Sequence, residues 1–213
     1  MKVNILTDNN HSFLINSLKH IKKLIMDEGH QCKIFYSHSK ISKGDILLLL
    51  GCDKILSSRN LTLHKKNFVI HPSKLPKGKG GASLIWEILK GKKVFYLTMF
   101  NANTKVDAGN IVFVRKFKLK GYELHDEIRH IQKIETIKLI KKFLKNLNNI
   151  KEKKQSGTDS YNRKRNPLDS EIDINKSIND QFNLLRVCDN KNYPAFFIKN
   201  KKKYILKIYK SNE

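Results

Sequence analysis

Hydrophobic residues recur along the first fifty positions in two patterns, one typical of strands and one typical of a helix. An apolar stretch at 2–7 predicts a strand, and apolar residues at helical spacing run from Ser12 to a stop at Gly29. A second strand is predicted at Gln31–Tyr36, which completes a β-α-β unit with parallel strands. The segment Asp45–Leu50 is continuously apolar, as expected for a strand that is covered on both faces.

The rest of the chain continues this alternation and then departs from it. It predicts further strands at 67–71, 93–100 and 111–119, helices at 82–89, 123–147 and 177–187, and a hairpin of 195–199 and 203–209. Residues 148–166 are polar without periodicity, which is typical of a mobile or surface-wrapping segment. We therefore expect an α/β fold with an open, mostly parallel sheet in a main domain at 1–147. A C-terminal extension at 148–213 should add a helix and a β-hairpin.

The composition is that of a folded and strongly basic protein. Of its 213 residues 39% are hydrophobic, and the formal net charge is +24. Only 6 of the 43 basic residues are Arg, and the others are Lys. Proteins that read phosphates or bases specifically favour Arg, because its planar fork binds bidentately. We therefore interpret the charge as a solvated Lys surface that attracts anionic small substrates, and we expect no specific nucleic-acid partner.

Nothing in the sequence predicts a membrane span, a secretion signal or a metal site. The longest apolar run, Ile46–Gly51, is much shorter than the roughly 18 residues that cross a bilayer. The first apolar stretch is followed at once by polar Thr7–Asn10, so it lacks the long hydrophobic region of a signal peptide. The three cysteines, Cys32, Cys52 and Cys188, lie far apart without ligand spacing. We expect a cytoplasmic protein with no membrane partner, no disulfide and no metal.

Candidate chemistry is concentrated where two predicted strands end. His71 closes one strand and is followed by Pro-Ser-Lys-Leu-Pro and a loop rich in Gly and Lys, and Asp107 lies in a later loop before Ala-Gly. A lone His at such a place is more often structural, and an Asp before Ala-Gly is more often a turn former. Together they place a base and an acid at the ligand-binding edge of the sheet.

The two segments together resemble the folate-dependent formyltransferases, through the His-Pro-Ser run at 71–76 and through Val106-Asp107-Ala108-Gly109. Residues 49–57 are similar to the segment of that family whose backbone binds the pteridine edge. The resemblance covers roughly residues 1–145 and implies a Rossmann-like formyltransferase domain. It also implies 10-formyltetrahydrofolate as the formyl donor, no metal, and His71 and Asp107 as the catalytic pair. Folate contacts are implied at Lys54, Ile55, Leu56 and Val106.

The C-terminal third resembles one subgroup, the sugar-nucleotide N-formyltransferases. The similarity lies in 165–173, 177–187, 192–197 and 203–208, and the small enzymes that act on UDP-4-amino-4,6-dideoxy-N-acetyl-altrosamine in pseudaminic acid-type pathways are the nearest. It implies that the acceptor is a nucleotide-linked 4-amino-4,6-dideoxy sugar destined for a surface glycan. Candidate substrate-binding residues are Asn9, Ser73, Lys77, Lys79 and Asn101, with the two lysines placed for a diphosphate. Whether the protein forms a homodimer stays open.

One position departs from the family. Its members have an Asn two residues before the catalytic His as an oxyanion donor, and here that position is Val69. Loss of such a donor costs about 10²–10³ in rate when nothing replaces it. Our hypothesis is that Asn101, the Ser73 hydroxyl or an ordered water takes over this role.

Three alternative functions remain. Glycinamide ribonucleotide formyltransferase would explain Val-Asp-Ala-Gly but not the C-terminal pattern. Methionyl-tRNA formyltransferase would use the positive charge, but we expect a larger C-terminal domain in that family than the residues left here after Arg165. A non-catalytic RNA-binding module built on the Lys-rich tail at 191–210 predicts steep salt dependence and no folate binding.

Overall fold

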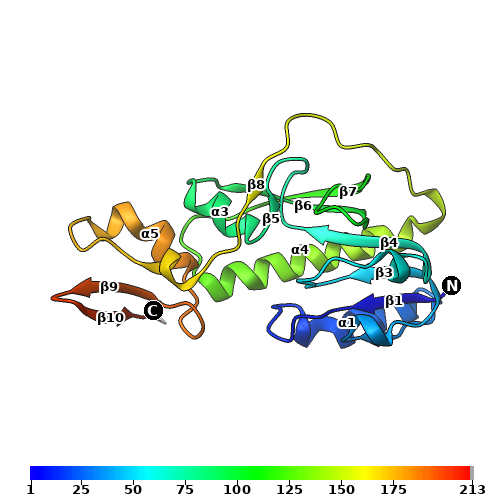
Figure 1. The fold of residues 1–213 in the computed structure, drawn as a ribbon, viewed down its shortest axis with the longest axis horizontal. Helices are drawn as coiled ribbons and strands as arrows, with labels where there is room; N and C mark the ends of the chain where they lie inside the picture. The colour runs from blue at the N-terminus through cyan, green and yellow to red at the C-terminus, as the bar shows by residue number, and fades with distance from the viewer. Residues whose placement is uncertain (212–213) are drawn as a thin grey trace.

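The fold is built on one central sheet. The structure, a computed structural model, describes residues 1–211. The sheet has six strands in the order β2-β1-β3-β4-β6-β7 (Figure 1). Its parallel half consists of β1 (Val3–Leu6), β2 (Ile34–Phe35), β3 (Gly44–Leu49) and β4 (His64–His71). Its antiparallel half adds β6 (Val94–Asn101) and β7 (Ile111–Lys118). This confirms the Rossmann-like, mostly parallel fold class.

The helices follow the predicted pattern with small shifts at their ends. They are α1 (Leu18–Asp27), α2 (Ser58–Leu61), α3 (Ser83–Leu89), α4 (His125–Lys145) and α5 (Ile178–Val187), and short 3-10 turns lie at Ile15–Ser17, His38–Lys40, Leu147–Asn149 and Pro167–Ser170. The long helix α4 crosses the sheet, as Figure 1 shows. Within the described residues, no helix combines the length and apolar character that crossing a membrane requires.

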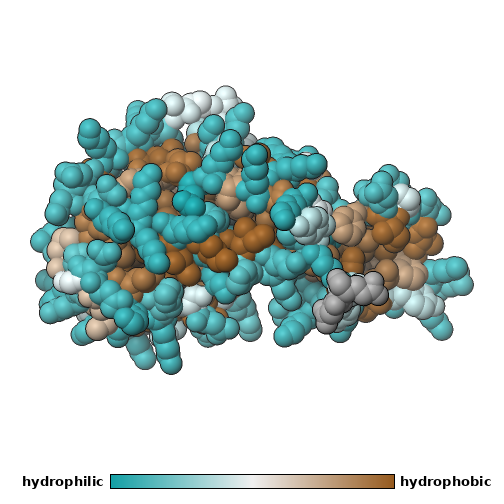
Figure 2. Space-filling view, turned by 180° about the vertical axis from the view of Figure 1, so that it is seen from behind, coloured by the Kyte–Doolittle hydropathy of each residue, from teal (hydrophilic) through white to brown (hydrophobic). Residues whose placement is uncertain are grey.

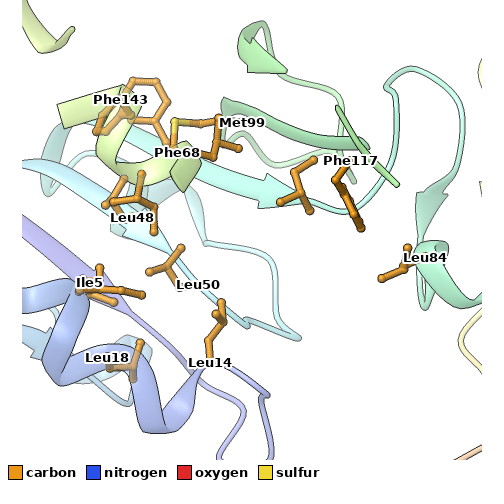
Figure 3. Close-up of a cluster of buried hydrophobic side chains, with 14 of the residues drawn as sticks. Ile5, Leu14, Leu18, Leu48, Leu50, Phe68, Leu84, Met99, Phe117 and Phe143 are labelled. Atoms are coloured by element: carbon orange, nitrogen blue, oxygen red, sulfur yellow. The ribbon is translucent and has the colours of Figure 1, made fainter. Parts of the chain in front are cut away.

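Apolar side chains of the central strands alternate between two cores. On β3, Ile46 and Leu48 join a large core with α1, α3 and α4, whereas Leu47 and Leu49 join a smaller core on the opposite face. Figure 3 shows side chains of the large core pointing toward one another from the sheet and from these helices. Phe68 of β4 meets Phe143 of α4 edge to face, with ring centroids 5.0 Å apart. This alternation explains why the central strands are almost continuously apolar in sequence.

The C-terminal part forms a separate projection at one end of the molecule (Figure 1). Strands β9 (Ala195–Lys199) and β10 (Lys202–Leu206) make the predicted antiparallel hairpin. Its small core is made of Ile172, Leu185, Cys188 and Ala195. Figure 2 shows hydrophobic side chains on the surface of this projection, while hydrophilic side chains cover much of the body.

The sequence pattern was misleading at two places. The strand predicted at 31–36 shrinks to Ile34–Phe35, and Gln31 makes only an isolated bridge to Lys2. The polar segment after α4 arches over the sheet in Figure 1 and ends in β8 (Tyr161–Asn162), which pairs in parallel with β5 (Lys79–Gly80). We call residues 151–162 the strap. The strap wraps the surface as expected. Its strand β8 was not predicted, because the strap lacks the apolar residues that indicate a strand in the sequence.

Candidate active site

His71 is the last residue of β4, in the middle of the sheet, and its side chain is buried. Its Nε2 lies 2.8 Å from the carbonyl oxygen of Gly78 and 3.1 Å from the Ser83 hydroxyl at the start of α3. A carbonyl can only accept a hydrogen bond, so Nε2 carries the hydrogen. The surroundings therefore fix the tautomer, and Nδ1 is the ring atom left for chemistry.

Asp107 reaches this Nδ1 from the loop between β6 and β7. Its Oδ2 lies 3.4 Å from Nδ1 of His71 and accepts a hydrogen bond of 2.8 Å from the backbone N–H of Gly80. Both side chains are sheltered, with exposed fractions of 9% for His71 and 14% for Asp107. The structure thus brings together the two residues that the sequence singled out, from positions far apart in the chain.

The backbone of the Asp107 loop is tightly constrained. Asp107 has a φ of +48°, a conformation that residues other than Gly rarely adopt. Gly109 lies against the end of β6, where a Cβ would stand only 1.6 Å from the carbonyl oxygen of Asn101. Strain held in place by the surrounding structure is common at functional sites. The loop geometry therefore supports a functional role for Asp107 beyond turn formation.

A second polar cluster lies at the carboxyl ends of β1 and β3. The buried carboxylate of Asp8 accepts hydrogen bonds from the backbone N–H groups of Asp53 and Lys54 and lies 2.7 Å from Nε2 of His38. Asp8 thereby fixes the start of the loop that carries Leu56. The sequence places Asp8 after the first strand, at the edge where ligands collect or as a helix cap, and it does not predict these contacts with the next loop.

An apolar wall adjoins this loop. Leu56 is buried in the smaller core, and Val69 and Ala102 pack against the same core. Ile55 and Val106 are 50% and 42% exposed. The four residues predicted to contact folate therefore divide into exposed Lys54, Ile55 and Val106 and buried Leu56.

Among the residues considered as substitutes for the missing Asn, the structure separates Ser73 from Asn101. Asn101 pairs with Phe68, whose side chain lies on the α4 face of the sheet, and its amide donates to Glu152. Val69 lies on the other face. The side chain of Asn101 therefore turns away from the site, and that part of the hypothesis is corrected. Ser73 is buried, and its hydroxyl has no hydrogen-bond partner within residues 1–211.

The two lysines of the Gly-rich loop have different surroundings. Lys77 is exposed, whereas the side chain of Lys79 is buried with its Nζ 2.7 Å from Asp159 of the strap. Lys79 therefore neutralises a carboxylate of the protein and is not a free charge for a diphosphate. Asn9 donates to the Asp53 carboxylate and accepts from the N–H of His11, which makes it a turn residue in this structure.

The remaining chemistry-bearing groups near the sheet edge are inert or dispersed. Burial raises the pKa of the Cys52 thiol to about 12, with the Asp8 charge adding to the effect, so the thiol stays protonated at neutral pH. Across the described part of the chain, no group of three or more His, Cys, Asp or Glu side chains is arranged to hold a metal ion.

Comparisons with known proteins show the family and the fold of this chain. The family described as formyl transferase matches residues 28–141, more than half of the chain. The bifunctional polymyxin resistance protein ArnA of Wigglesworthia glossinidia brevipalpis is 30% identical over 162 residues, which are 73% of this chain and 24% of that protein. The chain thus spans about a quarter of the length of this curated relative.

Two solved structures share the fold at lower identity. A methionyl-tRNA formyltransferase from Clostridium thermocellum has a TM-score of 0.81 and 20% identity, over 100% of this chain and 94% of its own. A sugar N-formyltransferase from Shewanella sp. has a TM-score of 0.75 and 16% identity, over 98% and 97%. The family match spans β2 through most of α4 and includes both His71 and Asp107. This chain belongs to the formyl transferase family.

Proposed function

We propose that the protein transfers a formyl group from 10-formyltetrahydrofolate to the amino group of a nucleotide-linked 4-amino-4,6-dideoxy sugar. The observation that carries this proposal is the His71–Asp107 pair, with Nδ1 and Oδ2 3.4 Å apart, inside the segment that matches the formyl transferase family. The pair combines a proton-carrying ring and a carboxylate at the ligand-binding edge of the sheet.

The reaction needs charge stabilisation on one atom and a proton transfer between two others. The acceptor amine attacks the formyl carbon, a C–N bond forms, and negative charge develops on the formyl oxygen. When Nδ1 of His71 carries a proton, it donates to that oxygen, because Nε2 is already occupied by the Gly78 carbonyl. The proton of the attacking amine passes through Asp107 to the departing folate nitrogen as the bond from that nitrogen to the formyl carbon breaks.

The family's Asn, which donates to the oxyanion, is replaced by Val69 in this chain. In this proposal the Ser73 hydroxyl or an ordered water donates to the formyl oxygen in its place. The hydroxyl is buried two residues after His71 and has no partner in the described chain. A buried hydroxyl without a partner is costly, and a ligand oxygen would satisfy it. Val69 then contributes only to the apolar wall.

The folate is assigned to the edge formed by the loop after β3 and the loop after β6. The carboxylate of Asp8 occupies the N–H groups of Asp53 and Lys54, whereas the N–H and C=O groups of Leu56 have no partner within residues 1–211. These free backbone groups suit the donor and acceptor edge of a pteridine, and exposed Ile55 and Val106 provide an apolar surface beside it.

A nucleotide-linked sugar is favoured as acceptor by the likeness to the Shewanella sugar N-formyltransferase over 98% of this chain and 97% of that one. The basic surface, with exposed Lys77 beside the site, would attract a diphosphate. Methionyl-tRNA is the second candidate acceptor. The Clostridium thermocellum structure covers this chain fully and is itself 94% covered, which supports this candidate. The matched 85 residues of the Borreliella burgdorferi methionyl-tRNA formyltransferase are 27% of that protein, which agrees with the expectation of a longer enzyme.

Formyl transfer to separate acceptors tests the proposal. The enzyme is given 10-formyltetrahydrofolate with a panel of uridine- and thymidine-diphosphate 4-amino-4,6-dideoxy sugars, with glycinamide ribonucleotide, and with methionyl-tRNA. Folate absorbance and product mass report transfer. We expect transfer to one sugar nucleotide. Transfer to glycinamide ribonucleotide or to methionyl-tRNA alone would overturn the acceptor, and folate-independent RNA binding without transfer would overturn the enzyme.

A further inference from the structure

The strap makes contact with both catalytic loops although it follows them by more than forty residues. At its start, Lys153 bridges in antiparallel fashion to Ile111, directly after the Asp107 loop. At its end, β8 pairs with β5 in the loop that follows His71. A polar segment without a helix of its own thus connects the two loops whose meeting forms the site.

Gln155 is the least exposed residue between 151 and 161. Every other residue from 151 to 161 is exposed, whereas Gln155 is partly buried. Its Nε2 donates to the carbonyl oxygens of Asp107 and Gly109, both at 2.8 Å. Because both partners can only accept, the amide nitrogen must face them, and its two hydrogens match the two carbonyls. Its Oε1 has no partner in residues 1–211, so these two bonds alone orient the carboxamide.

The second half of the strap holds the other loop. The Ser160 hydroxyl accepts a 2.8 Å hydrogen bond from the N–H of Gly78, and the Ser160 carbonyl accepts one from Lys79. Gly78 is the residue whose carbonyl binds Nε2 of His71. At Gly80 the fit is close, since a Cβ there would stand 2.4 Å from the carbonyl oxygen of Asn162.

We infer that the strap is a positioning element of the active site and that Gln155 is a positioning residue for Asp107. Gln155 ties the carbonyls on either side of Ala108, so it holds a loop whose backbone at Asp107 is strained. Without it, the carboxylate loses its fixed place beside Nδ1 of His71. This inference rests on the proposed function, since it assigns Gln155 to the same reaction.

Two variants of Gln155 separate hydrogen bonding from space filling. Gln155→Glu keeps the shape but replaces the donor with a carboxylate facing two carbonyl oxygens, and Gln155→Ala removes the group. A misplaced catalytic group costs about 10²-fold when it moves by about 1 Å. We expect kcat to fall about tenfold to a hundredfold in both variants, with the KM values for donor and acceptor unchanged. Lys154→Ala, an exposed neighbour on the strap, should match the wild type.

Hydrogen exchange measured on the same proteins makes the outcome independent of the acceptor. We expect faster amide exchange in peptides covering 102–110 in both Gln155 variants, and unchanged exchange in β3. Wild-type exchange of 102–110 in Gln155→Glu would overturn the inference even if no acceptor were found. A wild-type kcat in Gln155→Glu would overturn it as well, and so would a fall in kcat that Lys154→Ala shares. Absence of turnover in the wild type would instead count against the proposed function.

Discussion

The sheet and the strap are held by different forces, and both contribute to the geometry of the candidate site. His71 ends β4. Phe68 of the same strand is 1% exposed and packs on Phe143 of α4. Asp107 lies on a loop whose carbonyl oxygens accept hydrogen bonds from the side-chain amide of Gln155. Apolar packing therefore positions the strand that carries the histidine, whereas polar contacts from a remote segment position the carboxylate and the Gly78 loop that binds the histidine ring.

This difference means that stability and activity should respond separately to mutation. Core packing contributes most of the free energy of unfolding, because buried apolar area is the dominant favourable term. The strap buries little apolar surface, so its contacts should matter more for geometry than for stability.

His71→Ala should give the largest loss of activity. The ring is the group that would donate to the formyl oxygen, and removing such a group lowers kcat by about 10²–10⁴-fold. The unfolding temperature should stay close to that of the wild type because the core is untouched. Steady-state kinetics and thermal unfolding check this. The control is His20→Ala, an exposed histidine on α1, and near-normal turnover in His71→Ala would remove His71 from the mechanism.

Phe143→Ala should give the largest loss of stability. Phe143 is fully buried between the sheet and α4, and truncating such a side chain lowers the free energy of unfolding by about 3–5 kcal/mol. Urea unfolding measures it. We expect kcat per folded molecule to change little at a temperature where the variant is folded. A kcat that falls as far as in His71→Ala would show that the core and the site are not separable.

Gly109→Ala should displace the Asp107 loop. A Cβ would stand 1.6 Å from the Asn101 carbonyl oxygen, so the backbone must move. We expect kcat to fall about 10²-fold, because a shift of about 1 Å at a catalytic group costs that much. Gly91→Ala serves as the control. The φ of Gly91 is +75°, so alanine strains the backbone there, but the added Cβ would meet nothing within 4 Å. If both variants kept full activity, the tight fit of the loop would have no catalytic role.

Asp169→Asn should change the acid stability of the C-terminal part by a small amount. Hydrogen bonds from the Arg163 guanidinium lower the pKa of Asp169 to about 2, with the N–H of Asn166 adding to the effect. The unfolded pKa is about 3.9. A lowered folded pKa contributes stability above about pH 4 that is lost as the pH falls toward about 2. Unfolding temperatures from pH 6 to pH 2 should therefore drop more steeply in the wild type than in Asp169→Asn, and parallel curves would contradict this.

The sheet could be predicted from the sequence because its strands carry apolar residues on both faces. Asp45–Leu50 stood out as a covered strand for this reason, and the structure has it at Gly44–Leu49. His71 and Asp107 stood out through their motifs. The pairing of Lys79 with Asp159 and the turn of Asn101 toward Glu152 depend on a segment whose sequence has no periodicity.

Gln155 could not have been found in this way. Its partners are two backbone carbonyls, and backbone groups leave no residue signature in the sequence. Its neighbours on the strap are polar and exposed, so nothing distinguished it from the surrounding Lys and Ser residues. The physical signal is a partly buried side chain in an otherwise exposed segment, and only the structure shows it.

Single-turnover transfer from 10-formyltetrahydrofolate labelled with carbon-13 in the formyl group shows whether the His71–Asp107 pair moves the formyl group to the acceptor. Excess enzyme is mixed with the labelled donor and an amino-sugar nucleotide, and mass spectrometry locates the label. We expect the label on the acceptor amine with the wild type and its near absence there with His71→Ala and Asp107→Asn. Label released only as formate, or equal transfer by all three proteins, would contradict a formyl transfer carried out by this pair.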